Sequence, residues 1–166
     1  MDRAMNNLED DELLALARRD AENGRLEEAL RKLKPMITQA DGPVEALAFA
    51  ARIYAQLQLA ERAQACYRRY LAARPDAVLE SFELGVTHFE RGEAADAERL
   101  WQGVLKRSPT HPPTLFYSAV QAARGGREAD ARRHLEVLLQ AVPGDNLYVQ
   151  RGRALLTEMD GAREGH

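Results

Sequence analysis

The side chains best suited to chemistry are few and lie far apart in the sequence. There are four histidines, His88, His111, His134 and His166, and a single cysteine, Cys66. Zinc sites bring several such ligands together, and no two of these histidines stand at a ligand spacing. Cys66 has no partner for an internal disulfide and no base that its sequence position would place beside it. The pattern predicts no catalytic residue, no metal site and no cofactor.

Two further segments have a structural interpretation. The acidic run from Glu9 to Glu12 suits the first turn of a helix, because carboxylates there complement the helix dipole. The segment from Arg124 to Gly126 fills a turn position and lacks the strand, lysine and hydroxyl of a phosphate-binding loop. We therefore interpret neither segment as a ligand site.

The composition is typical of a soluble globular protein. Of the 166 residues, 45% are hydrophobic and 30% are charged, which allows one domain with a sizeable core. A net charge of −3 gives no field that would hold a polyanion, so we expect no nucleic-acid partner. The chain starts without a signal-peptide pattern and has no apolar run long enough to span a membrane. Together with the single cysteine, these features predict a cytoplasmic protein with no membrane partner.

The chain repeats itself at an interval of 34 residues. The segment RGEAADAERL, from Arg91, is echoed by GGREADARRH, from Gly125, and more faintly by segments from Leu57 and Asn23. Two columns of residues set the register, namely Ala29, Ala63, Ala97 and Ala131, and Asp41, Pro75, Pro109 and Pro143. This register predicts repeats at 10–43, 44–77, 78–111 and 112–145.

Each repeat has the pattern of a helical hairpin. In the third repeat, Gly92 is placed to end a first helix and Pro109 to end a second one. Because one hairpin cannot bury its own apolar face, neighbouring hairpins must stack. The sequence predicts an all-α fold, a solenoid of four hairpins. We expect a C-terminal capping helix at 146–160 and mobile ends at 1–9 and 161–166.

This pattern resembles the tetratricopeptide repeat family over residues 10–145. The small eighth position of the repeats holds Ala17, Ala51, Gly85 and Ala119, and the bulky twenty-fourth position holds Leu33, Tyr67, Trp101 and Leu135. The turn glycine is present as Gly24, Gly92 and Gly126. The resemblance implies a right-handed solenoid whose first helices line a concave binding groove.

The departures from the family pattern are specific. Gln58 replaces the turn glycine of the second repeat, so we expect that turn to be built differently. Asp41 stands where proline is usual, and Gly42 and Pro43 supply the break. The normally apolar eleventh position holds Asp20 and His88, which either bond locally or mark a looser seam.

The first helices carry apolar and charged side chains on the face that would line the groove. All four phenylalanines fall there, and two arginines occupy the same position in neighbouring repeats. The predicted peptide-binding residues are Leu14, Arg18, Phe49, Arg52, Phe82, Glu83, Val86, Phe89, Phe116, Tyr117, Val120 and Arg124. Either these side chains shield one another or they form a partner surface. The N-terminal segment or a second copy could also fill the groove.

We predict a non-enzymatic protein-interaction module that binds a peptide segment of another protein, as an adaptor, a scaffold or a chaperone-like protein. The arginines would suit an acidic residue followed by apolar ones. The chain lacks the lysine and asparagine clamp that binds chaperone carboxylates, because Leu14, Phe49 and Glu83 are among the residues in those places. One alternative is a self-assembling homo-oligomeric scaffold. The other is an enzyme with a site around His88 or Cys66.

Overall fold

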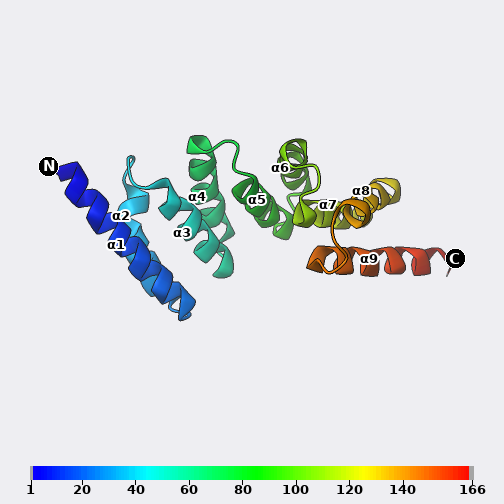
Figure 1. The fold of residues 1–166 in the computed structure, drawn as a ribbon, viewed down its shortest axis with the longest axis horizontal. Coiled ribbons are helices and arrows are strands. Elements are labelled where there is room, and N and C mark those ends of the chain that lie inside the picture. Colours follow the sequence, from blue (N-terminus) through cyan, green and yellow to red (C-terminus); the bar gives the residue numbers. More distant parts are fainter. Residues whose placement is uncertain (1, 165–166) are drawn as a thin grey trace. The chain divides into compact units, whose positions relative to one another are not determined.

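A computed structural model describes the backbone of residues 2–164 and the side chains of residues 9–163. Within these residues the chain forms nine helices and no strand, which confirms the predicted all-α fold (Figure 1). None of these helices combines the length and the apolar character needed to cross a membrane. The helices are α1 (Asp2–Glu22), α2 (Leu26–Thr38), α3 (Val44–Gln56), α4 (Ala60–Ala73), α5 (Val78–Glu90), α6 (Ala94–Arg107), α7 (Pro112–Arg124), α8 (Glu128–Ala141) and α9 (Leu147–Glu164).

Contacts divide the chain into two compact units, residues 1–80 and residues 81–166. In the first unit, α1 packs against α2, α2 against α3, and α3 against α4. In the second unit, α6 packs against α7, α7 against α8, and α9 against both α7 and α8. Most of α5 belongs to the second unit, where it contacts α6. Short turns join the helices, so each unit is built from helical hairpins.

Small residues allow the helices of a hairpin to lie close together. Ala17 and Ala29 are fully buried in the first hairpin, and Ala51 and Ala63 are fully buried in the second. A larger side chain at such a crossing would overpack the interface, typically at a cost of about 1–3 kcal/mol. The alanines that recur in the sequence therefore fix how closely the helices approach.

Gly85, on α5, makes room for the largest side chain of the second unit. A Cβ atom at this position would lie 2.2 Å from Nε1 of Trp101, which is closer than real Cβ contacts allow. Trp101 is 1% exposed, and its Nε1 donates a hydrogen bond to the carbonyl oxygen of Phe82 at 3.2 Å. The indole therefore ties α6 to α5 in the space that the glycine leaves.

The last helix, α9, covers the apolar side of the fourth hairpin. Val149 of α9 is buried with Leu115 of α7 and Leu135 and Leu138 of α8. A Cβ atom at Gly152 would lie 3.0 Å from Cδ2 of Leu138, so the glycine allows α9 to approach α8 closely. We expected a capping helix at 146–160, and α9 spans Leu147–Glu164.

The helical backbone extends beyond the ends that the sequence indicated. The first helix, α1, begins at Asp2 and includes residues 2–9, for which we expected a mobile segment. The last helix continues to Glu164, and residues 165–166 of the expected mobile tail lie outside the described residues. Between these ends, Pro75, Pro109 and Pro143 each follow the end of a helix, in agreement with the inability of proline to continue one.

Each turn inside a hairpin contains one residue with a left-handed backbone conformation. Gly24, Gly92 and Gly126 have φ angles of 75°, 75° and 72°. Gln58 has a φ angle of 60° at the equivalent place, so our expectation of a different second turn was wrong. Hydrogen bonding explains this result, because Leu59 N donates to the carbonyl oxygen of Tyr54 at 2.8 Å, as Glu93 N donates to that of His88 at 2.9 Å.

Replacing Gln58 with glycine is expected to stabilise the second hairpin. The left-handed conformation costs a non-glycine residue about 1–2 kcal/mol, and the greater freedom of glycine in the unfolded chain cancels part of this gain. We expect Gln58→Gly to raise the free energy of unfolding by about 0.5–1 kcal/mol in chemical denaturation. Gly92→Ala, the reciprocal change, should lower it. A Gln58→Gly protein less stable than the wild type would contradict this account of the turn.

Candidate functional site

Four rings from three helices form a continuous row in the second unit. Phe89 of α5, Tyr117 and Phe116 of α7 and Tyr148 of α9 are each partly exposed. The ring centroids of Phe89 and Tyr117 are 5.7 Å apart, those of Tyr117 and Phe116 are 5.7 Å apart, and those of Phe116 and Tyr148 are 5.9 Å apart. The first two pairs meet edge to face, the arrangement that aromatic quadrupoles favour. We call these four residues the aromatic face.

Two arginines lie over the rings of this face. The Arg124 guanidinium carbon is 4.9 Å from the centre of the Phe89 ring, and that of Arg151 is 5.8 Å from the centre of the Tyr148 ring. Both arginines are exposed, so the cation–π contacts leave their charges at the surface. The aromatic face therefore combines apolar rings with positive charge.

The hydroxyl of Tyr117 adds a hydrogen-bond donor. Burial, reinforced by the nearby Tyr148 and Glu90, raises the pKa of Tyr117 above its ordinary value, while Arg151 acts in the opposite direction. The phenol therefore stays protonated at neutral pH and keeps its hydrogen-bond donor.

Phe82 lies beneath the aromatic face rather than on it. Its side chain is buried, and its ring packs 5.6 Å from the rings of His111 and Tyr117 and 6.4 Å from that of Trp101. Leu14, in the first unit, is buried in the same way. The sequence placed both residues on the binding surface, but they have little surface of their own to offer a ligand, because neighbouring helices cover them.

The remaining predicted residues of α5 and α7 are half-buried. Glu83 and Val86 lie on α5, and Val120 lies on α7, one turn from Phe116. Tyr148, on α9, was not among the predicted binding residues. The structure instead places its ring against Phe116.

Apart from Leu14, the predicted residues of the first unit line a separate recess of about 200 Å³. Arg18, Phe49 and Arg52 line it together with Glu80 and Tyr70. Arg52 NH2 is 2.8 Å from Glu80 Oε1, so this arginine already has a carboxylate partner within the chain. Arg18 is exposed at the same recess.

Tyr70 is a recess residue that sequence reasoning missed. It stands at the repeat position that holds Met36, Val104 and Leu138 elsewhere, and these three side chains are buried in the core. Tyr70 is only partly buried, and burial, together with Glu80, raises its pKa. A tyrosine at an otherwise aliphatic position was the signal that could have identified it.

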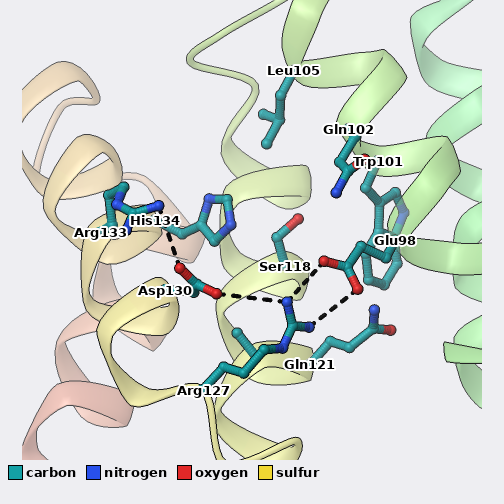
Figure 2. Close-up of a pocket in the computed structure, with 11 residues that line it drawn as sticks. Glu98, Trp101, Gln102, Leu105, Ser118, Gln121, Arg127, Asp130, Arg133 and His134 are labelled. Carbon is teal, nitrogen blue, oxygen red and sulfur yellow. Dashed lines mark hydrogen bonds and ion pairs between the residues drawn. The ribbon is translucent and has the colours of Figure 1, made fainter. Parts of the chain in front are cut away.

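A polar cavity of about 240 Å³ lies among α6, α7 and α8 of the second unit (Figure 2). Arg127 crosses it, with NH1 2.8 Å from Glu98 Oε1 and NH2 3.1 Å from Glu98 Oε2. Asp130 lies 3.6 Å from Arg127 NH1 and 3.3 Å from Arg133 NH1. The charges that line this cavity are therefore paired with one another, unlike those on the aromatic face.

The two polar residues at the normally apolar eleventh position bond locally. Asp20 accepts hydrogen bonds from Lys32 and from Arg25, and these bonds hold the pKa of its carboxyl below the ordinary value. His88 Nδ1 is 2.5 Å from Glu93 Oε2. The sequence left open whether these two residues bond locally or mark a looser seam between the helices. The contacts show that they bond locally.

Cys66 is buried on α4, and burial raises the pKa of its thiol. A thiol in this state is a poor nucleophile at neutral pH, because the reactive form is the thiolate. The residue packs as a small apolar group.

The chain matches the family described as tetratricopeptide repeat at residues 50–112 and 82–146, which together make up more than half of its length. A search of curated proteins finds no match. Among solved structures, the chain is similar to a tetratricopeptide repeat protein from Parabacteroides merdae, with a TM-score of 0.83 and 19% identity. That similarity covers 95% of this chain and 62% of the other, so the chain spans less than two thirds of that relative.

Two MamA structures are also similar in fold. MamA from Desulfovibrio magneticus, from residue 41 to its end, has a TM-score of 0.78 at 18% identity, over 92% of this chain and 86% of that one. Another MamA structure has a TM-score of 0.76 at 18% identity, over 89% of this chain and 86% of that one. At these identities the likeness shows the fold alone. From the repeat match and the helical hairpins, we conclude that the chain belongs to the tetratricopeptide repeat family.

Proposed function

We propose that the chain is a protein-interaction module and that its aromatic face binds a segment of another protein. Proteins of this family mediate protein–protein interactions, and the fold is generally non-enzymatic. The observation that carries the proposal is the row of partly exposed rings from α5 across α7 to α9. Contiguous apolar surface of this kind is typical of a partner-binding site.

The chemistry of the aromatic face favours an apolar segment that contains an acidic residue. The rings offer apolar surface, and aromatic residues are enriched among the side chains that dominate binding energy. Arg124 and Arg151 can each form charge-assisted hydrogen bonds with a carboxylate, and Tyr117 can donate one more hydrogen bond. We therefore expect a bound segment with apolar side chains on the rings and a carboxylate beside them.

We propose the recess of the first unit as a further contact region. Arg52 already forms an ion pair with Glu80. Arg18 is therefore the arginine that we expect to bind an acidic side chain of the partner. Phe49 contributes a half-buried ring beside it. In this proposal the repeats at 10–43, 44–77, 78–111 and 112–145 make up an adaptor, a scaffold or a chaperone-like protein, and each compact unit offers a contact region of its own.

We infer that the chain is not an enzyme. The thiol of Cys66 is buried and its pKa is raised, which disfavours nucleophilic attack. His88 Nδ1 contacts Glu93 Oε2 within its own hairpin. Neither residue lies in the recess of the first unit or in the polar cavity of the second.

The test of the proposed function is the affinity of the full chain for a captured partner segment. A partner isolated with the wild-type chain would be mapped to a binding segment, and its dissociation constant measured by calorimetry. We expect the segment to contain apolar residues with a nearby Asp or Glu, and its affinity to fall when that acid is replaced by its amide. An affinity unaffected by every change on the aromatic face would remove the proposal.

A homo-oligomeric scaffold is the second candidate, because large apolar side chains are exposed outside the aromatic face. Leu147 at the start of α9 is 52% exposed and Leu79 on α5 is 48% exposed. Light scattering at several protein concentrations tests self-association directly. The interaction-module proposal predicts the mass of a single chain of 18.6 kDa throughout. A mass that rises with concentration and falls back in Leu147→Ala would favour the scaffold.

A further inference from the structure

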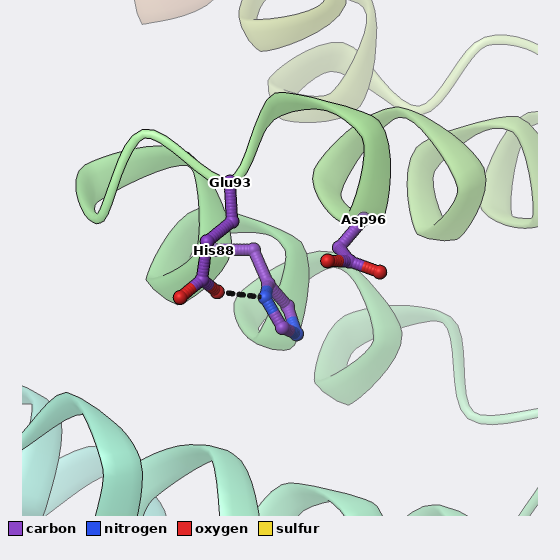
Figure 3. Close-up of side chains that lie close together, drawn as sticks. All are labelled: His88, Glu93 and Asp96. Carbon is purple, nitrogen blue, oxygen red and sulfur yellow. Dashed lines mark hydrogen bonds and ion pairs between the residues drawn. The ribbon is translucent and has the colours of Figure 1, made fainter.

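Three side chains of types that bind metal ions lie close together at the turn between α5 and α6. His88 lies in the last turn of α5, Glu93 immediately precedes α6, and Asp96 lies in the first turn of α6. One nitrogen or oxygen atom from each residue lies within 4.8 Å of the others. Figure 3 shows both carboxylates turned towards the imidazole ring. We call these three residues the hairpin cluster.

We propose that the hairpin cluster binds a divalent cation of the zinc class. Zinc in proteins takes histidine nitrogen and carboxylate oxygen at about 2.0–2.2 Å, which puts neighbouring donors about 3–4 Å apart. The donors of the cluster therefore need to move by about 1 Å or less to share one ion. Three protein ligands leave a position for water, and imidazole in the set favours zinc over magnesium or calcium.

The other repeats of the chain lack this combination, which makes them an internal comparison. The equivalent positions hold Asp20, Arg25 and Glu28 in the first repeat, Tyr54, Leu59 and Arg62 in the second, and Ala122, Arg127 and Asp130 in the fourth. An acid in the first turn recurs in three repeats and suits the helix dipole. The helix dipole does not explain why the third repeat alone also has a histidine and a second acid at the other two positions.

The burial of His88 makes the cluster a built site rather than a group of surface acids. The histidine is 6% exposed, and Glu93 and Asp96 are half-buried. Its contact with Glu93 Oε2 holds the ring in one orientation. A metal ligand whose ring is already oriented loses little freedom on binding.

Two arginines orient the carboxylates of the cluster. Arg91 Nε donates to Glu93 Oε1 at 2.6 Å, and Arg99 NH2 donates to Asp96 Oδ1 at 2.5 Å. The ion would bind the second oxygen of each carboxylate, and at Glu93 this oxygen is Oε2, so the ion would replace its contact with His88 Nδ1. The positive charges of the arginines oppose a dication, so we expect micromolar rather than nanomolar affinity. The site is independent of the proposed partner binding, although the neighbouring Phe89 belongs to the aromatic face.

The direct test is calorimetric titration of the full chain with Zn²⁺ and, separately, with Mg²⁺. We expect one Zn²⁺ per chain and no heat of binding with Mg²⁺. His88→Gln and Asp96→Asn should each weaken Zn²⁺ binding at least tenfold, the loss seen even for residues that only orient a ligand. His134→Gln, which changes a half-buried histidine on α8, is the matched control and should leave the affinity unchanged.

A second measurement separates loss of the site from loss of the fold. Co²⁺ bound by the cluster should show visible absorption that Zn²⁺ abolishes, and Zn²⁺ should raise the melting temperature of the wild type but not of Asp96→Asn. Asp96→Asn changes a single atom of a partly exposed side chain, so it decides the question if His88→Gln is unfolded. Equal Zn²⁺ affinity in wild type and Asp96→Asn, no binding by the wild type, or loss of binding in His166→Ala would each overturn the proposal.

Discussion

The Trp101→Ala protein is expected to lose about 3–5 kcal/mol of its free energy of unfolding. Trp101 is 1% exposed, packs against the rings of Phe82 and Phe89 and fills the space beside Gly85. Its removal would leave a cavity, whose cost adds to the lost burial of the indole. The indole hydrogen bond to the carbonyl oxygen of Phe82 would be lost as well.

Denaturation by urea, followed by circular dichroism, measures this loss. Leu147→Ala is the control, because Leu147 is 52% exposed and its truncation should change stability by less than about 0.5 kcal/mol. Hydrogen exchange should show that Trp101→Ala weakens protection in α5 and α6 before it does so in α3 and α4. If Trp101→Ala cost no more than Leu147→Ala, the indole would not be the centre of the second unit.

Local signals in the sequence were enough to predict the hairpins. Glycine at a recurring turn position and proline after the second helix act through their own backbones, so residue type alone identifies them. Gln58 shows the limit of this reasoning. Its side chain disfavours the left-handed turn, yet the hydrogen bond between Leu59 N and the Tyr54 carbonyl oxygen closes the same turn as elsewhere.

Burial on the predicted binding surface could not be predicted from helical periodicity. Phe82 and Phe89 lie on the same side of α5, but only Phe82 is buried. Both rings contact Tyr117, but the Phe82 ring is also covered by His111, from the turn that follows α6. Such cover depends on how adjacent hairpins meet, which no single helix pattern contains.

The sequence contained a signal for the polar contacts made at the eleventh repeat position. Asp20 and Arg25, and His88 and Glu93, stand five residues apart at the same two repeat positions. In both repeats the polar residue at the end of the first helix has a partner at the start of the second. A complementary pair at these positions would have predicted the local bond, and with it the hairpin cluster.

Removing two rings from the aromatic face is expected to weaken partner binding by about 2–4 kcal/mol, roughly 30-fold to 1,000-fold. Phe89 and Phe116 each contact the ring of Tyr117, so Phe89→Ala with Phe116→Ala takes the apolar surface from both sides of it. Because both side chains are only partly buried, the helicity should be retained. Phe82→Ala would be a poor choice for this test, since it removes a buried ring and weakens the fold itself.

Calorimetry with the captured partner segment checks this prediction. Leu59→Ala is the control, because it truncates an apolar side chain that is 41% exposed in the first unit. A double variant that stays helical and binds as tightly as Leu59→Ala would show that the rings serve packing alone.

Photo-crosslinking tests the central claim most directly, because it reports which surface touches the partner. A photoreactive phenylalanine analogue would be introduced at Arg124, beside the aromatic face, and in a separate protein at Arg133, beside the polar cavity of Figure 2. Both positions are exposed helix residues of the second unit. If the aromatic face is the binding surface, the partner will be crosslinked at position 124 and not at position 133. Crosslinking at position 133 alone would contradict it.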